Sequence, residues 1–260
     1  HIGSLFESLL EFKLVKAEKK LMRKGLEIKD YKKLAGKKAD DWEVIEQNEF
    51  FLDSISEDRK STGSFYTPDY IVNYLCEKTI DPLLEGNSVE ECLEMNFCDP
   101  SMGSGHFILG IVKRLEMHLQ KIKTSEGAED SINFENIRKE IVRNCTFGVD
   151  INPLAVELAK FSIWIYCLNK GDELICLESN LRHGDSLSEN EKSYKLNFDW
   201  KNEFKSVFKK NGFDAIVGNP PYNSLRKLSE VTRSRIEQND SEFYDASGDL
   251  YYHFMKLAVD

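Results

Sequence analysis

The chain has 260 residues, enough for one large domain or for one domain with an extension. With 41% hydrophobic and 31% charged residues its composition is globular. Its longest apolar run, residues 161–168, is far shorter than the roughly 20 residues of a membrane-spanning helix, which excludes a spanning protein. The formal net charge of −10 argues against a chain whose whole surface wraps nucleic acid.

The six cysteines form neither a CxxC pair nor a Cys/His spacing typical of a metal site. No basic patch followed by an apolar stretch begins the chain, so we expect no secretory signal. The simplest interpretation is a cytoplasmic protein whose cysteines are reduced thiols in its core. We therefore expect no bound metal.

Residues 1–60 are predicted to form a helical segment. Apolar side chains recur at helical spacing within residues 4–22, Gly25 marks a break, and a second helix is expected over residues 41–56. Residues 13–38 are rich in lysine. A solvated helix face explains these lysines, and a surface that faces nucleic acid is the alternative.

From residue 61 onward, short apolar runs alternate with amphipathic stretches. The predicted strands cover residues 93–98, 146–149, 180–183 and 213–217, and the predicted helices cover residues 68–84, 105–123 and 153–168. Thr67 and Asn152 are expected to cap two of these helices. The alternation predicts an α/β domain with a parallel sheet between helices, which binds ligands beyond the carboxyl ends of its strands. Residues 187–212 and 223–248 are polar and predicted to be rich in loops.

A glycine-rich turn, residues 99–107, follows the first predicted strand and opens a helix. Glycines let a backbone turn approach a ligand, and a helix N-terminus offers unpaired N–H groups. No Gly-Lys-Ser/Thr follows, which excludes a phosphate loop, and Ile108 stands where a dinucleotide-binding turn would need its third glycine. The acid ahead of the turn, Asp99, suits a cationic ligand instead.

Two further acids follow predicted strands. Asp150 could accept hydrogen bonds from both hydroxyls of a ribose, with Ile151 as an apolar contact for an adenine ring. Because Asn152 is the better helix cap, we expect Asp150 to be free for a ligand. Asp185 could accept a hydrogen bond from an adenine amino group, although Gly-Asp-Ser is also a common turn.

The stretch Asn219-Pro220-Pro221-Tyr222 follows the last predicted strand and is the most informative. Two prolines fix the backbone and remove two N–H donors, which leaves the Asn219 side-chain oxygen and the Pro220 carbonyl as acceptors. Both hydrogens of an exocyclic amine on a flat ring would find acceptors there, and the ring would stack on Tyr222. Holding these hydrogens aims the nitrogen lone pair at an electrophile, so positioning and electrostatics would carry the rate without a strong general base.

In this order the motifs resemble those of adenine-specific (N6) DNA methyltransferases that use S-adenosylmethionine. The chain is similar to the gamma-class enzymes of restriction-modification systems, which include type I modification subunits and fused type II restriction-methylation enzymes. The resemblance covers residues 60–260 and rests on residues 62–68 (Thr-Gly-Ser-Phe-Tyr-Thr-Pro), 99–107, 150, 219–222 and 248–254 (Gly-Asp-Leu-Tyr-Tyr-His-Phe).

The resemblance implies a Rossmann-like sheet, a bound S-adenosylmethionine and a target adenine flipped out of the duplex. The implied catalytic residues are Asn219, Pro220, Pro221 and Tyr222. The implied cofactor contacts, from the methionine part to the adenine edge, are Phe65, Tyr66, Thr67, Asp99, Pro100, Ser101, Gly103, Ser104, Gly105, Phe107, Asp150, Ile151, Asp185 and Ser186. The implied partners are double-stranded DNA and a specificity subunit, a restriction subunit or a fused recognition domain, with no membrane.

Two features depart from the family pattern. The chain ends soon after the fourth predicted strand, so we expect a truncated core in which later strands, a second aromatic wall for the flipped base and a recognition domain are missing. The acidic net charge suggests that most DNA contacts lie in that missing part. Residues 226–235 carry four basic side chains and could form a DNA-facing loop or a solvated one.

Two other functions remain open. A methyltransferase acting on a protein glutamine or an RNA adenine would share the tetrapeptide at residues 219–222, but such relatives usually lack the motifs at residues 62–68 and 99–107. A non-catalytic cofactor-binding fragment is the second alternative: the intact tetrapeptide argues against it and the truncation argues for it. Residues 1–60 show no convincing nuclease signature.

Overall fold

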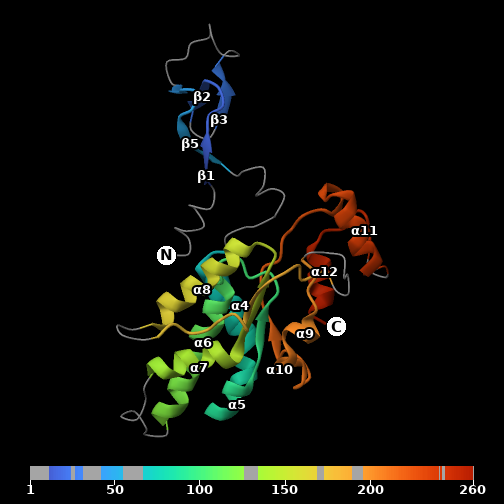
Figure 1. Ribbon diagram of the computed structural model, residues 1–260. Helices are drawn as coiled ribbons and strands as arrows, with labels where there is room; N and C mark the ends of the chain where they lie inside the picture. The colour runs from blue at the N-terminus through green and yellow to red at the C-terminus, as the bar shows by residue number, and fades with distance from the viewer. Residues whose placement is uncertain are drawn as a thin grey trace. The chain divides into compact units, whose positions relative to one another are not determined.

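The computed structural model describes residues 12–24, 27–31, 42–54, 67–125, 134–168, 173–188, 196–239, 241 and 244–259 (Figure 1). The chain divides into two compact units, His1–Thr62 and Gly63–Asp260. This division falls close to the boundary expected after residue 60. Among the residues just given, no helix is long and apolar enough to cross a membrane.

The first unit is built from short antiparallel strands. Its strands are β1 (Phe12–Lys16), β2 (Leu21–Lys24), β3 (Glu27–Asp30), β4 (Glu43–Ile45) and β5 (Phe50–Ser54). One sheet pairs β1 with β5, and the other has the order β3-β2-β4. Buried Ala17, Ile45 and Phe51 form its small core.

The prediction of a helical N-terminal segment is therefore wrong for the described residues of this unit. Helical spacing within residues 4–22 is a property of one segment, whereas β1 finds its partner in β5, more than 30 residues further on. The lysines lie on and beside strands: Lys19 pairs with Asp30 and Lys20 with Glu46, each at 2.6 Å. Residues 4–11 of the first predicted helix lie outside the described residues.

The second unit is built on a four-stranded parallel sheet of order β8-β7-β6-β9. Its strands are β6 (Phe97–Asp99), β7 (Thr146–Asp150), β8 (Leu181–His183) and β9 (Ala215–Ile216). The first strand of this unit, β6, lies inside the sheet, so the chain runs outward through β7 to β8 and then crosses to β9 on the far side of β6. The predicted α/β fold with a parallel sheet is confirmed.

Helices cover both faces of this sheet, as predicted. They are α4 (Asp69–Leu84), α5 (Val89–Glu94), α6 (His106–Ser125), α7 (Phe134–Cys145), α8 (Pro153–Cys167), α9 (Trp200–Glu203), α10 (Lys205–Phe208), the 3-10 turn η2 (Leu225–Lys227), α11 (Glu230–Asn239) and α12 (Tyr251–Leu257). Figure 1 shows α4, α6, α7 and α8 on one side of the strands and α9, α10 and α12 on the other.

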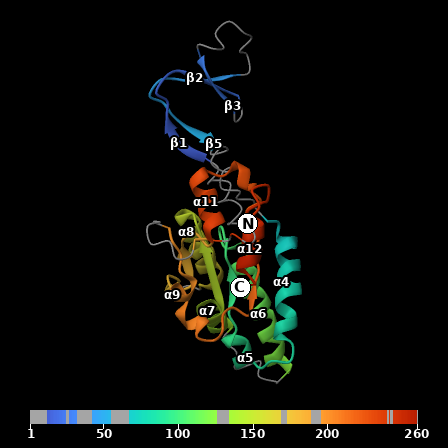
Figure 2. The same ribbon diagram turned by 90° about the vertical axis from the view of Figure 1, so that its right-hand side faces the viewer.

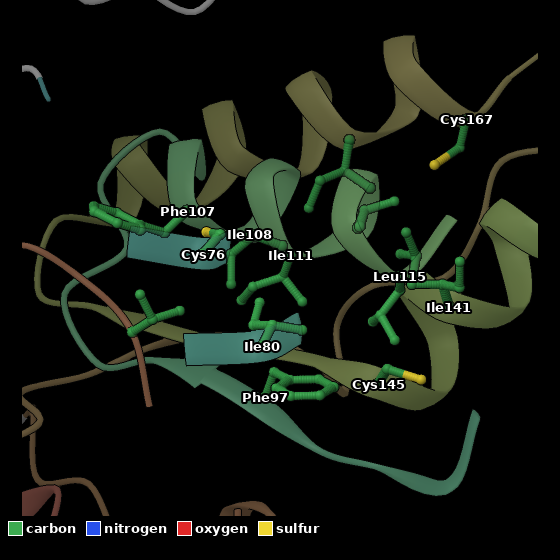
Figure 3. Close-up of a cluster of buried hydrophobic side chains, with 14 of the residues drawn as sticks. Cys76, Ile80, Phe97, Phe107, Ile108, Ile111, Leu115, Ile141, Cys145 and Cys167 are labelled. Atoms are coloured by element: carbon green, nitrogen blue, oxygen red, sulfur yellow. The ribbon is translucent and has the colours of Figure 1, made fainter. Parts of the chain in front are cut away.

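Two cores follow from the alternation of side chains along the strands. Phe97 belongs to the larger core between the sheet and α4–α8 (Figure 3), and its neighbour Cys98 belongs to the smaller one on the opposite face. The smaller core is aromatic, with the Phe147 and Phe204 ring centroids 5.4 Å apart. Burial on both faces holds the carboxyl ends of the strands in place.

Several predicted boundaries differ from the observed ones, most of all at the first strand of the parallel sheet. Leu93 was expected to begin a strand, but it lies in α5, and the strand begins at Phe97. The reason is a capping box: the Ser88 hydroxyl accepts from the Glu91 N–H and the Glu91 carboxylate accepts from the Ser88 N–H. The predicted loop-rich stretches contain α9 and α10 in the first and η2 and α11 in the second.

Five of the six cysteines are buried free thiols, and Cys176 is an exposed free thiol. Burial raises the pKa of Cys76 and of Cys145 to about 12, so these thiols are protonated at neutral pH. They act as small apolar side chains of the larger core (Figure 3). The prediction of core thiols holds for five cysteines and is wrong for Cys176.

Candidate functional site

The carboxyl edge of the parallel sheet gathers polar groups from four distant parts of the sequence. Asp99 ends β6, Asp150 ends β7, Asp185 follows β8 and Asn219 follows β9. Because the strands are parallel, all four ends lie at one edge. Ligands of such sheets bind at this edge.

The glycine turn is held against β7 and α8. The Met102 N–H donates to the Val149 carbonyl at 3.0 Å. Gly103 and Gly105 have φ angles of +53° and +85°, a conformation that other residues rarely adopt. A Cβ at Gly105 would lie 3.0 Å from the Ala159 Cβ, so a glycine here lets α6 begin directly against α8. The turn is therefore shaped by the protein itself.

Asp150 links this turn to the second strand end. Its Oδ2 accepts from the Gly103 N–H and its Oδ1 from the Asn152 N–H, both at 2.8 Å. Burial raises the pKa of Asp150, while these two backbone bonds lower it. Asn152 caps α8 as predicted, with its Oδ1 3.0 Å from the Leu154 nitrogen. Asp150 therefore has two backbone partners, and a carboxylate with two bonds retains two further acceptor positions. That Asp150 is free for a ligand stays a prediction.

Asp99 is a buried carboxyl group, 1% exposed. Its Oδ1 accepts from the Ser101 N–H at 3.0 Å. Burial raises the pKa of Asp99 to about 7, with a further rise from the charge of Asp150 and an opposing effect of the bonds to Ser101. A cationic ligand group beside it would stabilise the ionised form.

Gly218 makes the room that the Asp99 carboxyl occupies, because a Cβ at this position would collide with Oδ1 of Asp99. Sequence reasoning treated Gly218 only as the end of a strand. The available signal was a glycine directly before the Asn-Pro-Pro-Tyr stretch, but only the strand order places it opposite Asp99.

Three other residues of the glycine-turn motif are buried. Ser104 is buried, and the buried Pro100 accepts a hydrogen bond at its carbonyl from the Ser186 hydroxyl at 2.6 Å. Phe107 is 3% exposed and lies in the larger core (Figure 3). The first turn of α6 thus directs Phe107 into the core, and the structure does not place it in the site.

Asp185 forms a buried ion pair with α11. Its Oδ2 lies 2.6 Å from Nη2 of Arg235, both side chains are 9% exposed, and its Oδ1 accepts from the Leu187 N–H at 3.1 Å. With Ser186 bonded to Pro100, both residues expected at an adenine edge already have protein partners.

The basic stretch at residues 226–235 is not a loop. It forms η2 and the first turns of α11, and its last residue, Arg235, is buried. In Figures 1 and 2 α11 and α5 lie at opposite ends of this unit. Since α5 leads into β6, α11 lies at the carboxyl edge. The prediction of a loop here is wrong because a buried partner, Asp185, holds the helix against the sheet.

The Asn-Pro-Pro-Tyr stretch is tied to the segment before α4. The Asn219 side-chain nitrogen donates to Oγ1 of Thr67 at 3.1 Å. Thr67 was expected to cap α4, but the N-cap is Pro68, without a side-chain cap bond. Phe65 and Tyr66, expected beside Thr67, lie outside the described residues.

Tyr222 is 57% exposed and begins an aromatic group. Its ring centroid lies 5.5 Å from that of Tyr251, which stacks on Tyr252 at 4.3 Å. An antiparallel bridge between Ser224 and Asp249 brings the start of α12 beside the stretch that follows Tyr222. The edge thus carries an exposed tyrosine ring that follows Asn219 and Pro220 in the chain. Among the described residues, no group of three or more His, Cys, Asp or Glu side chains could hold a metal ion.

Residues 144–260 match the Eco57I restriction-modification methylase family. The chain is 26% identical over 199 residues to the adenine-specific methyltransferase PglX of Streptomyces coelicolor, across 66% of this chain and 15% of that protein. It is 25% identical over 221 residues to the type II restriction enzyme and methyltransferase RM.Eco57I of Escherichia coli, across 74% of this chain and 21% of that protein.

The fold is similar to that of the type IIL restriction-modification enzyme MmeI, solved in complex with DNA. The two share a TM-score of 0.51 and 16% sequence identity, over 78% of this chain and 29% of MmeI. This likeness concerns the fold alone. The chain spans 15% and 21% of the lengths of the two curated relatives.

Proposed function

We propose that the second unit is a methylase domain that transfers a methyl group from S-adenosylmethionine to the N6 amine of an adenine in double-stranded DNA. This would be the modification activity of a restriction-modification system. One observation supports the proposal. The Asn219–Tyr222 stretch follows β9, with the Tyr222 side chain 57% exposed, at the sheet edge where Asp99 and Asp150 end their strands. The similarity to PglX, an adenine-specific methyltransferase, supports adenine as the base.

The residues of the edge fit S-adenosylmethionine, which supplies an electrophilic methyl group on a sulfonium. Asp150 would bind the ribose hydroxyls through the acceptor positions that its bonds to Gly103 and Asn152 leave unused. Ile151, 47% exposed, would contact the adenine ring. Asp99 would compensate the positive charge of the cofactor. We leave Phe107 out of this set because it lies in the core. We also leave out Asp185 and Ser186, which are 7% and 5% exposed and bonded to Arg235 and Pro100, whereas Asp150 is only partly buried.

The target amine would donate its two hydrogens to Oδ1 of Asn219 and to the Pro220 carbonyl. With both hydrogens held, the nitrogen lone pair points toward the methyl group. The nitrogen would form a bond to the methyl carbon while the S–CH₃ bond breaks and its electron pair stays on the sulfur, which leaves S-adenosylhomocysteine. The nitrogen would then lose one proton to solvent. The base would stack on Tyr222, and it reaches that ring only after leaving the duplex. Further DNA contacts are proposed for a fused recognition domain or a separate subunit, in keeping with the much greater length of the relatives.

The test is methyl transfer by the full-length protein from labelled S-adenosylmethionine to duplex DNA, with mass spectrometry of the released nucleosides. We expect N6-methyladenine. Tyr222→Ala should lower the single-turnover rate by about 5- to 150-fold, because base–aromatic stacking contributes about 1–3 kcal/mol. Tyr74→Ala is the matched control, since Tyr74 is a similarly exposed tyrosine (60%) on α4. Label in RNA adenine or protein glutamine, with none in DNA, would overturn the proposal.

A further inference from the structure

Thr67 stands just before α4 but does not cap this helix. A threonine at the start of a helix normally accepts a backbone N–H of the first turn, which stabilises the helix by about 1 kcal/mol. Here the N-cap of α4 is Pro68, and no side chain makes a cap bond. Because positions that depart from local rules are often functional, the partner that Thr67 takes instead is informative.

That partner is the side-chain amide of Asn219, 152 residues further along the chain. Nδ2 of Asn219 donates to Oγ1 of Thr67 at 3.1 Å, and Thr67 is 8% exposed. The bond joins the segment that enters α4 to the stretch that follows β9. It is shielded from water on the Thr67 side, so solvent does not readily replace it.

The orientation of this amide decides what Asn219 offers to a substrate. One end of an amide accepts hydrogen bonds and the other end donates them. With Nδ2 bonded to Thr67, Oδ1 is the end left for a ligand. If the amide were rotated by 180°, its NH₂ group would face the amine of the substrate. Both groups are hydrogen-bond donors, so the side chain would bind the amine poorly.

We propose that Thr67 is a positioning residue for Asn219, whose hydroxyl holds the amide so that Oδ1 faces the amine to be methylated. This inference rests on the proposed function and deepens it. It assigns Thr67 to the target side of the reaction, whereas the family resemblance assigns it to the methionine part of the cofactor.

The kinetic test uses the full-length protein with saturating S-adenosylmethionine. Thr67→Val keeps the shape of the side chain and removes the hydroxyl, and we expect a single-turnover rate about tenfold lower, the size of one net hydrogen bond. Thr67→Ser keeps the hydroxyl and should restore the rate. The dissociation constant of the cofactor should be unchanged in both variants. A raised cofactor dissociation constant with an unchanged single-turnover rate in Thr67→Val would overturn the assignment.

Thr146→Val is the matched control. Thr146 is a fully buried threonine whose hydroxyl donates to the Val142 carbonyl at 3.0 Å, at the start of β7 and away from the carboxyl edge. The single-turnover rate of the Thr146→Val protein should equal that of the wild type. A loss equal to that of Thr67→Val would show that any buried hydroxyl has this effect, and would overturn the proposal.

A second measurement does not depend on methylation. The side-chain NH₂ signals of Asn219, identified by their disappearance in Asn219→Asp, report the bond directly in a ¹⁵N-labelled chain. We expect slow hydrogen exchange in the wild type and in Thr67→Ser, and fast exchange in Thr67→Val. Fast exchange in the wild type would overturn the positioning role. Slow exchange in a protein that methylates no DNA would keep the contact and refute the proposed function instead.

Discussion

The buried carboxyl of Asp99 should make the stability of the fold depend on pH. Asp99 is 1% exposed, and burial raises its pKa to about 7. In the unfolded chain an aspartate has a pKa of about 3.9. Between these two values the folded protein holds a proton that the unfolded chain releases. The folded state therefore loses stability as the pH rises through this window.

The size of this loss follows from the difference between the two pKa values. Each pKa unit corresponds to about 1.36 kcal/mol. A shift from about 3.9 to about 7 lowers the free energy of unfolding by about 4 kcal/mol as the pH rises from about 4 to about 7. Above about pH 7 no further loss from this group is expected, because Asp99 is then ionised in both states.

The assay is urea denaturation of the wild type and Asp99→Asn from about pH 4.5 to about pH 8. Asparagine has nearly the same shape and does not ionise, so the difference between the two proteins isolates Asp99. We expect the wild type to lose stability relative to Asp99→Asn as the pH rises. Glu90→Gln, at an exposed position on α5, controls for the removal of one surface carboxylate. A difference between wild type and Asp99→Asn that is the same at every pH would refute the reasoning.

Three further substitutions test contacts of the second unit, two by thermal or chemical unfolding and one by cofactor binding. Arg235→Met leaves Asp185 buried without its cation and should lower the free energy of unfolding by about 3–5 kcal/mol. The double variant Arg235→Met/Asp185→Asn should recover part of this loss. If it recovers none, the ion pair is not the cause. Gly148→Ala adds a Cβ that would collide with Sδ of Met102, at a cost of about 1–3 kcal/mol. Gly218→Ala adds a Cβ that would collide with the Asp99 carboxyl, and should weaken the binding of S-adenosylmethionine, measured by calorimetry, at least about tenfold. Unchanged binding would show that Asp99 does not contact the cofactor.

Much of the second unit could be predicted from local pattern. Apolar runs that end in acids or glycines gave four strands, and amphipathic stretches between them gave helices, so the parallel sheet followed. Asn152 was predicted to cap α8 for a chemical reason that acts within two residues, and it does. Such features depend on the residues nearest in sequence.

The first unit could not be predicted in this way. Apolar side chains at helical spacing predict a helix here, but residues 12–16 form β1 because they pair with β5. A pattern within one segment cannot predict a pairing with a distant one. The prediction of a loop at residues 226–235 fails because this segment, too, depends on a distant partner. Their polar composition gives no sign that Arg235 pairs with Asp185, 50 residues earlier, and so anchors a helix.

The sequence by itself determined which chemical groups this protein brings to the carboxyl edge: an acid after each of three strands, a glycine turn and a rigid cluster of acceptors beside a tyrosine. Only the tertiary structure decided what each group is bonded to. Asp150 holds the glycine turn, Asp185 holds α11 and Thr67 holds Asn219. The physical reason is range: propensity and spacing act over a few residues, whereas these bonds form when strand order and core packing bring remote segments together.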